Sequence, residues 1–92
     1  MKEIRILVLD DEKVFRDEIK EFLENDGFTV LLSDRPSAAF EMLTQQEVDI
    51  MILDIKLPEM DGFEVLRRVK EEYPDIEVIM ITGHGDMEAV IQ

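Results

Sequence analysis

Three aspartates, Asp10, Asp11 and Asp54, are the residues whose types and spacing predict chemistry. Asp10 and Asp11 follow the largely apolar run 4–9, and Asp54 follows the apolar run 50–53. Both runs predict buried parallel strands, so all three acids fall at the sheet edge where open α/β sheets bind ligands. At ~5 Å and an effective dielectric of about 20, each pair repels by roughly 3 kcal/mol. Such a site needs a divalent cation, raised carboxyl pKa values, or both, and we predict a Mg²⁺ pocket.

The elements that must position these acids follow from the spacing of apolar residues. Apolar runs alternate with segments of helical periodicity, a pattern typical of βαβ units and a parallel sheet. Gly27 predicts a helix end, Pro36 a first helical turn, Asp61 an N-cap and Pro74 a helix stop. We expect strands near 4–9, 29–32, 50–53 and 77–81, and helices over 13–25, from 36 onward and from 61 to 73.

Composition predicts one cytoplasmic domain with its own core. The chain has 92 residues, 46% of them hydrophobic, and no cysteine, which excludes a disulfide scaffold and a thiolate metal site. No apolar run approaches the ~18 residues of a membrane span, and the start at 1–3 is not a signal peptide. With 10 Lys and Arg against 23 Asp and Glu, the surface repels nucleic-acid phosphates, so we expect no direct nucleic-acid binding.

Four separated motifs agree in type, order and predicted element. They are the pair Asp10-Asp11, then Asp54, then the loop 57–62 with sequence LPEMDG, then Thr82. Together they resemble the receiver domain of bacterial two-component response regulators, over the whole chain. The resemblance implies a flavodoxin-like, doubly wound α/β fold with strand order 2-1-3-4-5.

The same resemblance implies a role for each site residue. Asp54 would be the phosphoryl acceptor, Asp11 a direct Mg²⁺ ligand and Asp10 a ligand through water. Lys56 would supply a backbone carbonyl ligand, and Thr82 would bond the phosphoryl group and shift as the switch. The implied function is a phosphoacceptor switch, not an enzyme with its own substrate, that accepts a phosphoryl group from a sensor histidine kinase. The run 82–86 further resembles receivers of NtrC-type activators, which implies an attached output domain and transcription regulation.

Several alternatives stay open from the residues alone. Asp11 could merely cap the helix over 13–25, and Asp54 could be an ordinary strand-end acid. Haloacid-dehalogenase-like phosphohydrolases also use a strand-end Asp with Mg²⁺, but they carry a second Asp two residues on, where this chain has Lys56. A nucleotide-binding flavodoxin-like protein is disfavoured because no Gly-rich loop follows the first strand. His84 is expected to be a solvated loop residue.

The end of the chain departs from the family pattern. A receiver continues through a fourth helix, a fifth strand bearing a phosphoryl-binding Lys, and a fifth helix, whereas here Asp86 is expected to cap a helix beginning at Met87. We therefore expect residues 1–92 to be an incomplete receiver with strand order 2-1-3-4. An alternative function is a truncated or pseudo-receiver that acts only through protein contacts. Because 76–81 would form an open apolar edge, we also expect a homodimer through this strand and the fourth helix.

Overall fold

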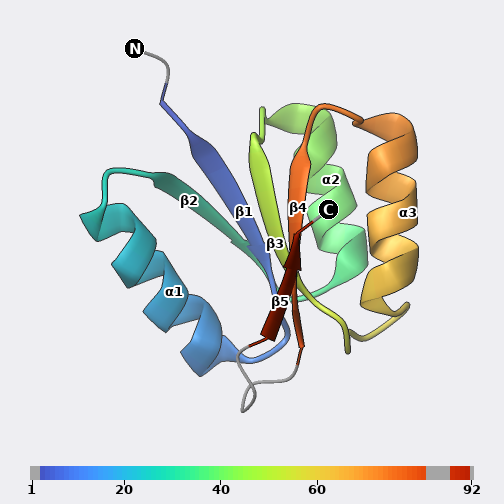
Figure 1. Ribbon diagram of the computed structural model, residues 1–92, viewed down its shortest axis with the longest axis horizontal. Helices are drawn as coiled ribbons and strands as arrows, with labels where there is room; N and C mark the ends of the chain where they lie inside the picture. Colours follow the sequence, from blue (N-terminus) through green and yellow to red (C-terminus); the bar gives the residue numbers. More distant parts are fainter. Residues whose placement is uncertain (1–2, 83–87, 92) are drawn as a thin grey trace.

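The chain forms a five-stranded sheet with helices on both faces (Figure 1), described by a computed structural model over residues 3–82 and 88–91. The strand order is β2-β1-β3-β4-β5. The first four strands are parallel, which confirms the predicted doubly wound sheet with order 2-1-3-4. The elements are β1 Arg5–Leu9, α1 Lys13–Asn25, β2 Thr29–Ser33, α2 Pro36–Gln45, β3 Ile50–Asp54, α3 Gly62–Glu72, β4 Glu77–Thr82 and β5 Glu88–Ile91.

The core divides into two layers because successive strand residues point to opposite faces. On one face, side chains such as Leu7, Leu53 and Met80 pack under α2 and α3. On the other, a smaller cluster around Val8 and Ile52 packs against α1, which contributes partly buried side chains. Burial on both faces explains why the strands are nearly continuous apolar runs.

The helix boundaries follow the predicted signals. Pro36 begins α2, and the Asp61 side chain accepts a hydrogen bond from the backbone N–H of Glu64, which caps α3. Gly27 adopts a φ of +93° just after α1, a backbone conformation that glycine takes at no steric cost. Within the described ranges, no helix combines the length and hydrophobicity needed to cross a bilayer.

Two predictions about the segment after β4 are wrong. The sequence predicts a helix from Met87, but Glu88–Ile91 form β5, antiparallel to β4; Asp86, Met87 and His84 themselves lie outside the described residues. The expectation of an open β4 edge is likewise wrong over Ile79–Thr82, which pairs with β5. The unpaired backbone groups along the edge of β4 offer hydrogen-bond partners to this segment, and β5 takes them up.

One prediction concerns the exposed face of α3. The Arg67 guanidinium donates to both Glu64 carboxylate oxygens, at 2.7 Å in the shortest contact, and these bonds hold the pKa of Glu64 below its usual value of 4.5. A lowered folded pKa contributes stability that is complete above the unfolded pKa and is lost as pH falls through the folded value. We expect Arg67→Gln to raise the pKa of Glu64 toward 4.5, measured by carboxyl-carbon NMR titration.

Arg68→Gln is the matched control for this titration. Arg68 also pairs with Glu64, but at 3.9 Å, so its removal should shift the Glu64 pKa less. Equal shifts in both variants would show that general surface charge, and not the Arg67 hydrogen bonds, lowers the Glu64 pKa.

Candidate metal site

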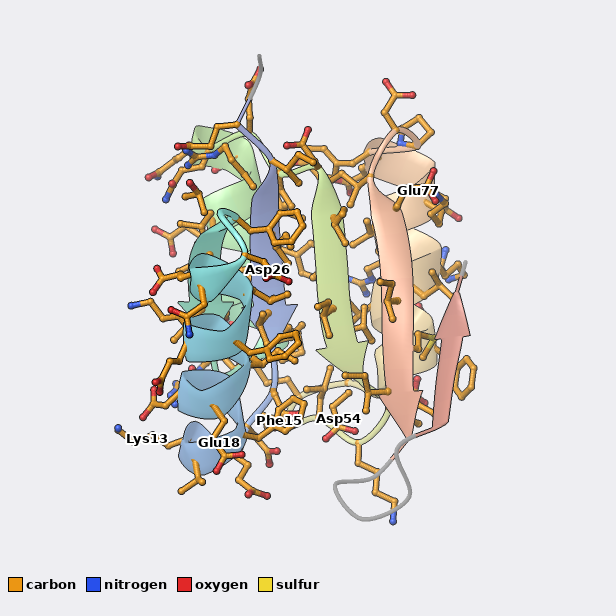
Figure 2. The ribbon with its side chains drawn as sticks, turned by 60° about the vertical axis from the view of Figure 1, so that its left-hand side comes forward. Lys13, Phe15, Glu18, Asp26, Asp54 and Glu77 are labelled. Carbon is orange, nitrogen blue, oxygen red and sulfur yellow. The ribbon has the colours of Figure 1, made fainter. Side chains whose placement is uncertain are left out.

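The structure brings together the three aspartates that the sequence singles out. One carboxylate oxygen from each of Asp10, Asp11 and Asp54 lies within 4.8 Å of the others. The register explains this convergence: Leu9 of β1 pairs with Leu53 of β3, so the next residues, Asp10 and Asp54, emerge side by side at the carboxyl ends of the two strands. Figure 2 shows Asp54 at this edge of the sheet, toward the same end of the molecule as Phe15 of α1.

Burial distinguishes the three acids. Asp10 and Asp54 are only 1% and 3% exposed, whereas Asp11 is exposed. Two carboxylates that are nearly removed from water and close together repel strongly, and each also carries a desolvation cost. The cluster therefore favours a bound cation. Its donors are all hard oxygens, the ligand type that Mg²⁺ prefers, so this set of residues fits a magnesium ion.

Backbone hydrogen bonds hold Asp10 in place. Its N–H donates to the carbonyl oxygen of Ser33 at 3.1 Å, which continues the ladder between β1 and β2 by one residue. Its Oδ1 accepts from the N–H of Glu12 at 2.8 Å, and its carbonyl oxygen accepts from the guanidinium of Arg16 at 2.7 Å. The loop after β1 is thus fixed from three sides. Arg16, which sequence reasoning did not single out, anchors this loop from the first turn of α1.

Asp54 is oriented by the loop that follows it. The N–H of Lys56 donates to Asp54 Oδ1 at 3.2 Å, so the residue two positions on fixes the carboxylate. The N–H of Ile55 donates to the carbonyl oxygen of Ile81 at 3.3 Å, which extends the pairing of β3 with β4. Lys56 is exposed and its backbone lies beside Asp54, whereas the role of its carbonyl oxygen as a metal ligand stays a prediction.

Gly62 has a role beyond the turn punctuation that its place in the sequence suggests. A Cβ atom on Gly62 would meet the carbonyl oxygen of Asp54 and would lie 2.8 Å from the Cα of Ile55. The N–H of Gly62 donates to the Ile55 carbonyl oxygen at 2.6 Å. The first residue of α3 thus packs directly against the backbone that carries Asp54. The Asp-Gly pair at a helix start is the local signal, but the clash partner is not visible in the sequence.

Thr82 is the last residue of β4. Because Asp54 pairs with Ile81, the Thr82 backbone lies one residue beyond that register, at the same sheet edge as the acids. Its side chain is outside what the structure describes, so its predicted contact with a phosphoryl group stays a prediction.

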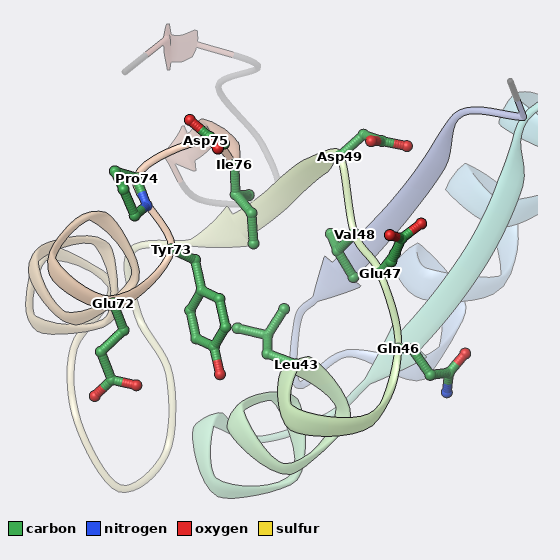
Figure 3. A pocket seen from close by; sticks show the side chains of 10 residues that line it. All are labelled: Leu43, Gln46, Glu47, Val48, Asp49, Glu72, Tyr73, Pro74, Asp75 and Ile76. Carbon is green, nitrogen blue, oxygen red and sulfur yellow. The ribbon is translucent and has the colours of Figure 1, made fainter.

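A surface hollow of about 470 Å³ lies at the opposite edge of the sheet from the three aspartates. It opens between the segments that precede β3 and β4, where the side chains of Leu43 and Tyr73 face each other (Figure 3). Glu47 and Asp75 are among the acids on its rim. Because it adjoins the amino ends of the strands, it takes no part in the acidic cluster.

Comparison with known proteins identifies the family to which the chain belongs. The response regulator receiver domain model matches residues 6–92. A response regulator of Rickettsia typhi described as NtrX-like is 37% identical over 93 residues, which cover 99% of this chain and 20% of that protein. Sporulation initiation phosphotransferase F of Bacillus subtilis is 30% identical over 86 residues, which cover 94% of this chain and 69% of that protein.

A solved structure agrees in fold and family. The response regulator TrrA of Thermotoga maritima, determined in complex with Mg²⁺ and BeF, superposes with a TM-score of 0.83 and 30% identity, covering 89% of this chain and 71% of that one. The chain itself spans about a fifth of the length of the NtrX-like relative. It belongs to the response regulator receiver domain family.

Proposed function

We propose that Asp54 accepts a phosphoryl group from a phosphohistidine of a sensor histidine kinase, with Mg²⁺ in the acidic cluster. Asp11, Asp54 and the Lys56 carbonyl oxygen would bind the ion directly, and Asp10 would bind it through water. The observation that carries this proposal is the convergence of three carboxylates, two of them buried, at the carboxyl edge of a parallel sheet. The Mg²⁺ in the TrrA structure supports the choice of metal.

The chemistry assigned to Asp54 is a carboxylate displacement at phosphorus. A carboxylate oxygen forms the new O–P bond as the P–N bond to the donor imidazole breaks, and the imidazole nitrogen leaves with the electron pair. The product is an acyl phosphate. The Lys56 N–H orients the nucleophile, and the rigid loop after β1 holds Asp10 beside it. When bound, the metal supplies positive charge that offsets the negative charge of the transferred group.

The switch and its readout complete the proposal. Thr82, at the end of the neighbouring strand, would donate its hydroxyl to the phosphoryl oxygen and move toward it. Phosphorylation and loss of the phosphoryl group would be the domain's only chemistry. The output would pass to a further domain, as the greater length of the NtrX-like relative suggests. The acidic surface, with net charge −13, argues against direct nucleic-acid binding by this domain, and the lack of cysteine suits a cytoplasmic location.

The presence of β5 alters the homodimer that the sequence predicts. Because β5 covers Ile79–Thr82, a second copy would have to pair with the outer edge of Glu88–Ile91 or displace that strand. Edge pairing through β4 therefore has a weaker basis than the sequence suggests.

The proposal is tested by intact-mass analysis after incubation with Mg²⁺ and acetyl phosphate. We expect the wild-type protein to gain the mass of one phosphoryl group and Asp54→Asn to gain none, because an amide oxygen is too weak a nucleophile. Asp61→Asn is the matched control: it makes the same change at an exposed cap position and should be labelled like the wild type.

Two outcomes would contradict the assignment. A phosphoryl adduct on Asp54→Asn would place the acceptor elsewhere. Magnesium binding by the wild type without any adduct would favour the alternative of a pseudo-receiver that acts only through protein contacts.

A further inference from the structure

We propose that Glu59 is a positioning residue for the acidic site. Its carboxylate binds the first turn of α2 and thereby holds the β3–α3 loop, residues 55–61, whose Lys56 lies beside Asp54. This inference rests on the proposed magnesium and phosphoryl site, because it concerns how the loop presents Lys56 to that site.

The contact joins two segments that are distant in sequence. Glu59 Oε1 accepts a hydrogen bond from the backbone N–H of Ser37 at 2.8 Å, and Oε2 accepts one from Ser37 Oγ at 2.9 Å, across 22 positions. Ser37 is the second residue of α2, and Arg35 at the N-cap position provides no side-chain cap. The carboxylate thus takes the place of a cap, and the positive end of the helix dipole favours its charge.

Glu59 makes this contact although its backbone has a left-handed conformation that residues with a Cβ atom rarely adopt. Its φ is +69°, and among the described residues no other non-glycine residue has a positive φ. A side chain with a Cβ atom disfavours this left-handed conformation, which glycine adopts freely. Glycine would turn the loop without strain but could not reach Ser37. The glutamate therefore provides what glycine cannot, a tether from the loop to α2.

The tether lies next to the proposed metal ligands. Glu59 and Pro58 line a surface hollow of about 270 Å³ together with Asp11, Asp34 and Arg35. The ends of the loop are attached to the sheet and to α3 by the bonds Lys56 N–H to Asp54 and Gly62 N–H to Ile55. Between these ends, the bonds from Glu59 to Ser37 tie the loop to a separate element. Without them, the loop can sample conformations in which the Lys56 carbonyl is less well placed for the ion.

Four substitutions separate positioning from simple stability. Glu59→Gly removes the carboxylate and relieves the strain, so its urea midpoint should stay near the wild-type value, whereas Glu59→Ala keeps the strain and should be less stable. Glu59→Gln can still accept from Ser37 and should lie between wild type and Glu59→Gly in every measurement. Ser37→Ala removes the hydroxyl donor but keeps the backbone donor, so its effects should be smaller. Glu47→Gln, an exposed glutamate at the opposite sheet edge, is the control for lost charge.

Two readouts are measured on each variant. Amide hydrogen exchange by NMR reports the tether directly, and we expect the Ser37 N–H to exchange about tenfold faster in Glu59→Gly. Calorimetric titration with Mg²⁺ reports positioning, and we expect affinity to fall about tenfold, the low end of the effect of losing a group that orients a metal ligand. Glu47→Gln also removes one surface charge, but far from the site. It should leave the Ser37 N–H exchange rate and the Mg²⁺ affinity close to their wild-type values.

The outcomes distinguish this inference from the function on which it rests. A wild-type protein that binds no Mg²⁺ overturns both. Wild-type Mg²⁺ binding with an unchanged affinity in Glu59→Gly overturns only the positioning role of Glu59. Unchanged Ser37 exchange in Glu59→Gly would show that the tether does not hold in solution, and would also overturn it.

Discussion

Asp54→Asn is expected to make the metal-free domain more stable, by about 1–3 kcal/mol, although it removes the proposed phosphoryl acceptor. Asp10 and Asp54 are 1% and 3% exposed, and their oxygens lie within 4.8 Å of each other and of Asp11. Replacing one of these carboxylates with a neutral amide removes a repulsion that folding must otherwise overcome. The three clustered carboxylates that the proposed function requires thus lower the stability of the metal-free domain.

The amide preserves the local hydrogen bonding, so the comparison isolates charge. In Asp54→Asn, the side-chain amide oxygen would still accept from the Lys56 N–H, as the carboxylate does at 3.2 Å. The new N–H₂ group would also donate toward the remaining carboxylates. No cavity is created, because asparagine and aspartate have nearly the same volume.

Magnesium should reverse the order of stability. A ligand that binds only the folded state adds about 4.1 kcal/mol at a concentration of about 1,000 Kd. We expect this gain for the wild type and little of it for Asp54→Asn, since the variant has lost one ligand and one charge. Urea unfolding with and without Mg²⁺ measures both effects, and Asp61→Asn serves as the control outside the cluster. A metal-free Asp54→Asn less stable than the wild type would show that the three carboxylates do not repel in the folded protein.

The parts of the fold that local patterns encode could be predicted from the sequence. The apolar runs ending at Leu9 and Leu53 indicate buried parallel strands, and the acids that follow them must share one sheet edge. Pro36 and Asp61 mark helix starts through the chemistry of their own backbone or side chain. Because a parallel sheet aligns the carboxyl ends of its strands, the acidic cluster follows from these signals without knowledge of any long-range contact.

The remaining features depend on contacts between distant segments. The bond from Glu59 to Ser37 spans 22 positions, and no local pattern predicts that a loop residue caps another helix. The last strand is a similar case: Glu88–Ile91 has a helix-compatible sequence but pairs with the edge of β4. Its conformation is set by the backbone groups available beside it, and not by its own propensity.

Gly62→Ala is expected to destabilise the domain by about 3 kcal/mol, the upper end of the usual cost of overpacking. The added methyl group would meet the Asp54 carbonyl oxygen and would lie 2.8 Å from the Ile55 Cα and 2.9 Å from the Leu53 Cδ1. Two of these three neighbours are backbone atoms, which cannot rotate away. Relief requires the start of α3 to move from the segment that carries Asp54, and this movement should also lower Mg²⁺ affinity and the rate of phosphorylation.

Gly27→Ala provides the matched control for a glycine-to-alanine change. Gly27 has a φ of +93°, and a methyl group added there would meet no atom within 4 Å apart from its own chain neighbours. Alanine therefore costs about 1 kcal/mol through backbone strain alone. Urea unfolding should therefore rank wild type above Gly27→Ala and Gly27→Ala above Gly62→Ala. Phosphorylation by acetyl phosphate, measured where each protein is fully folded, should fall only in Gly62→Ala. Equal phosphorylation in the two variants would mean that the packing of α3 against the Asp54 segment does not position the acceptor.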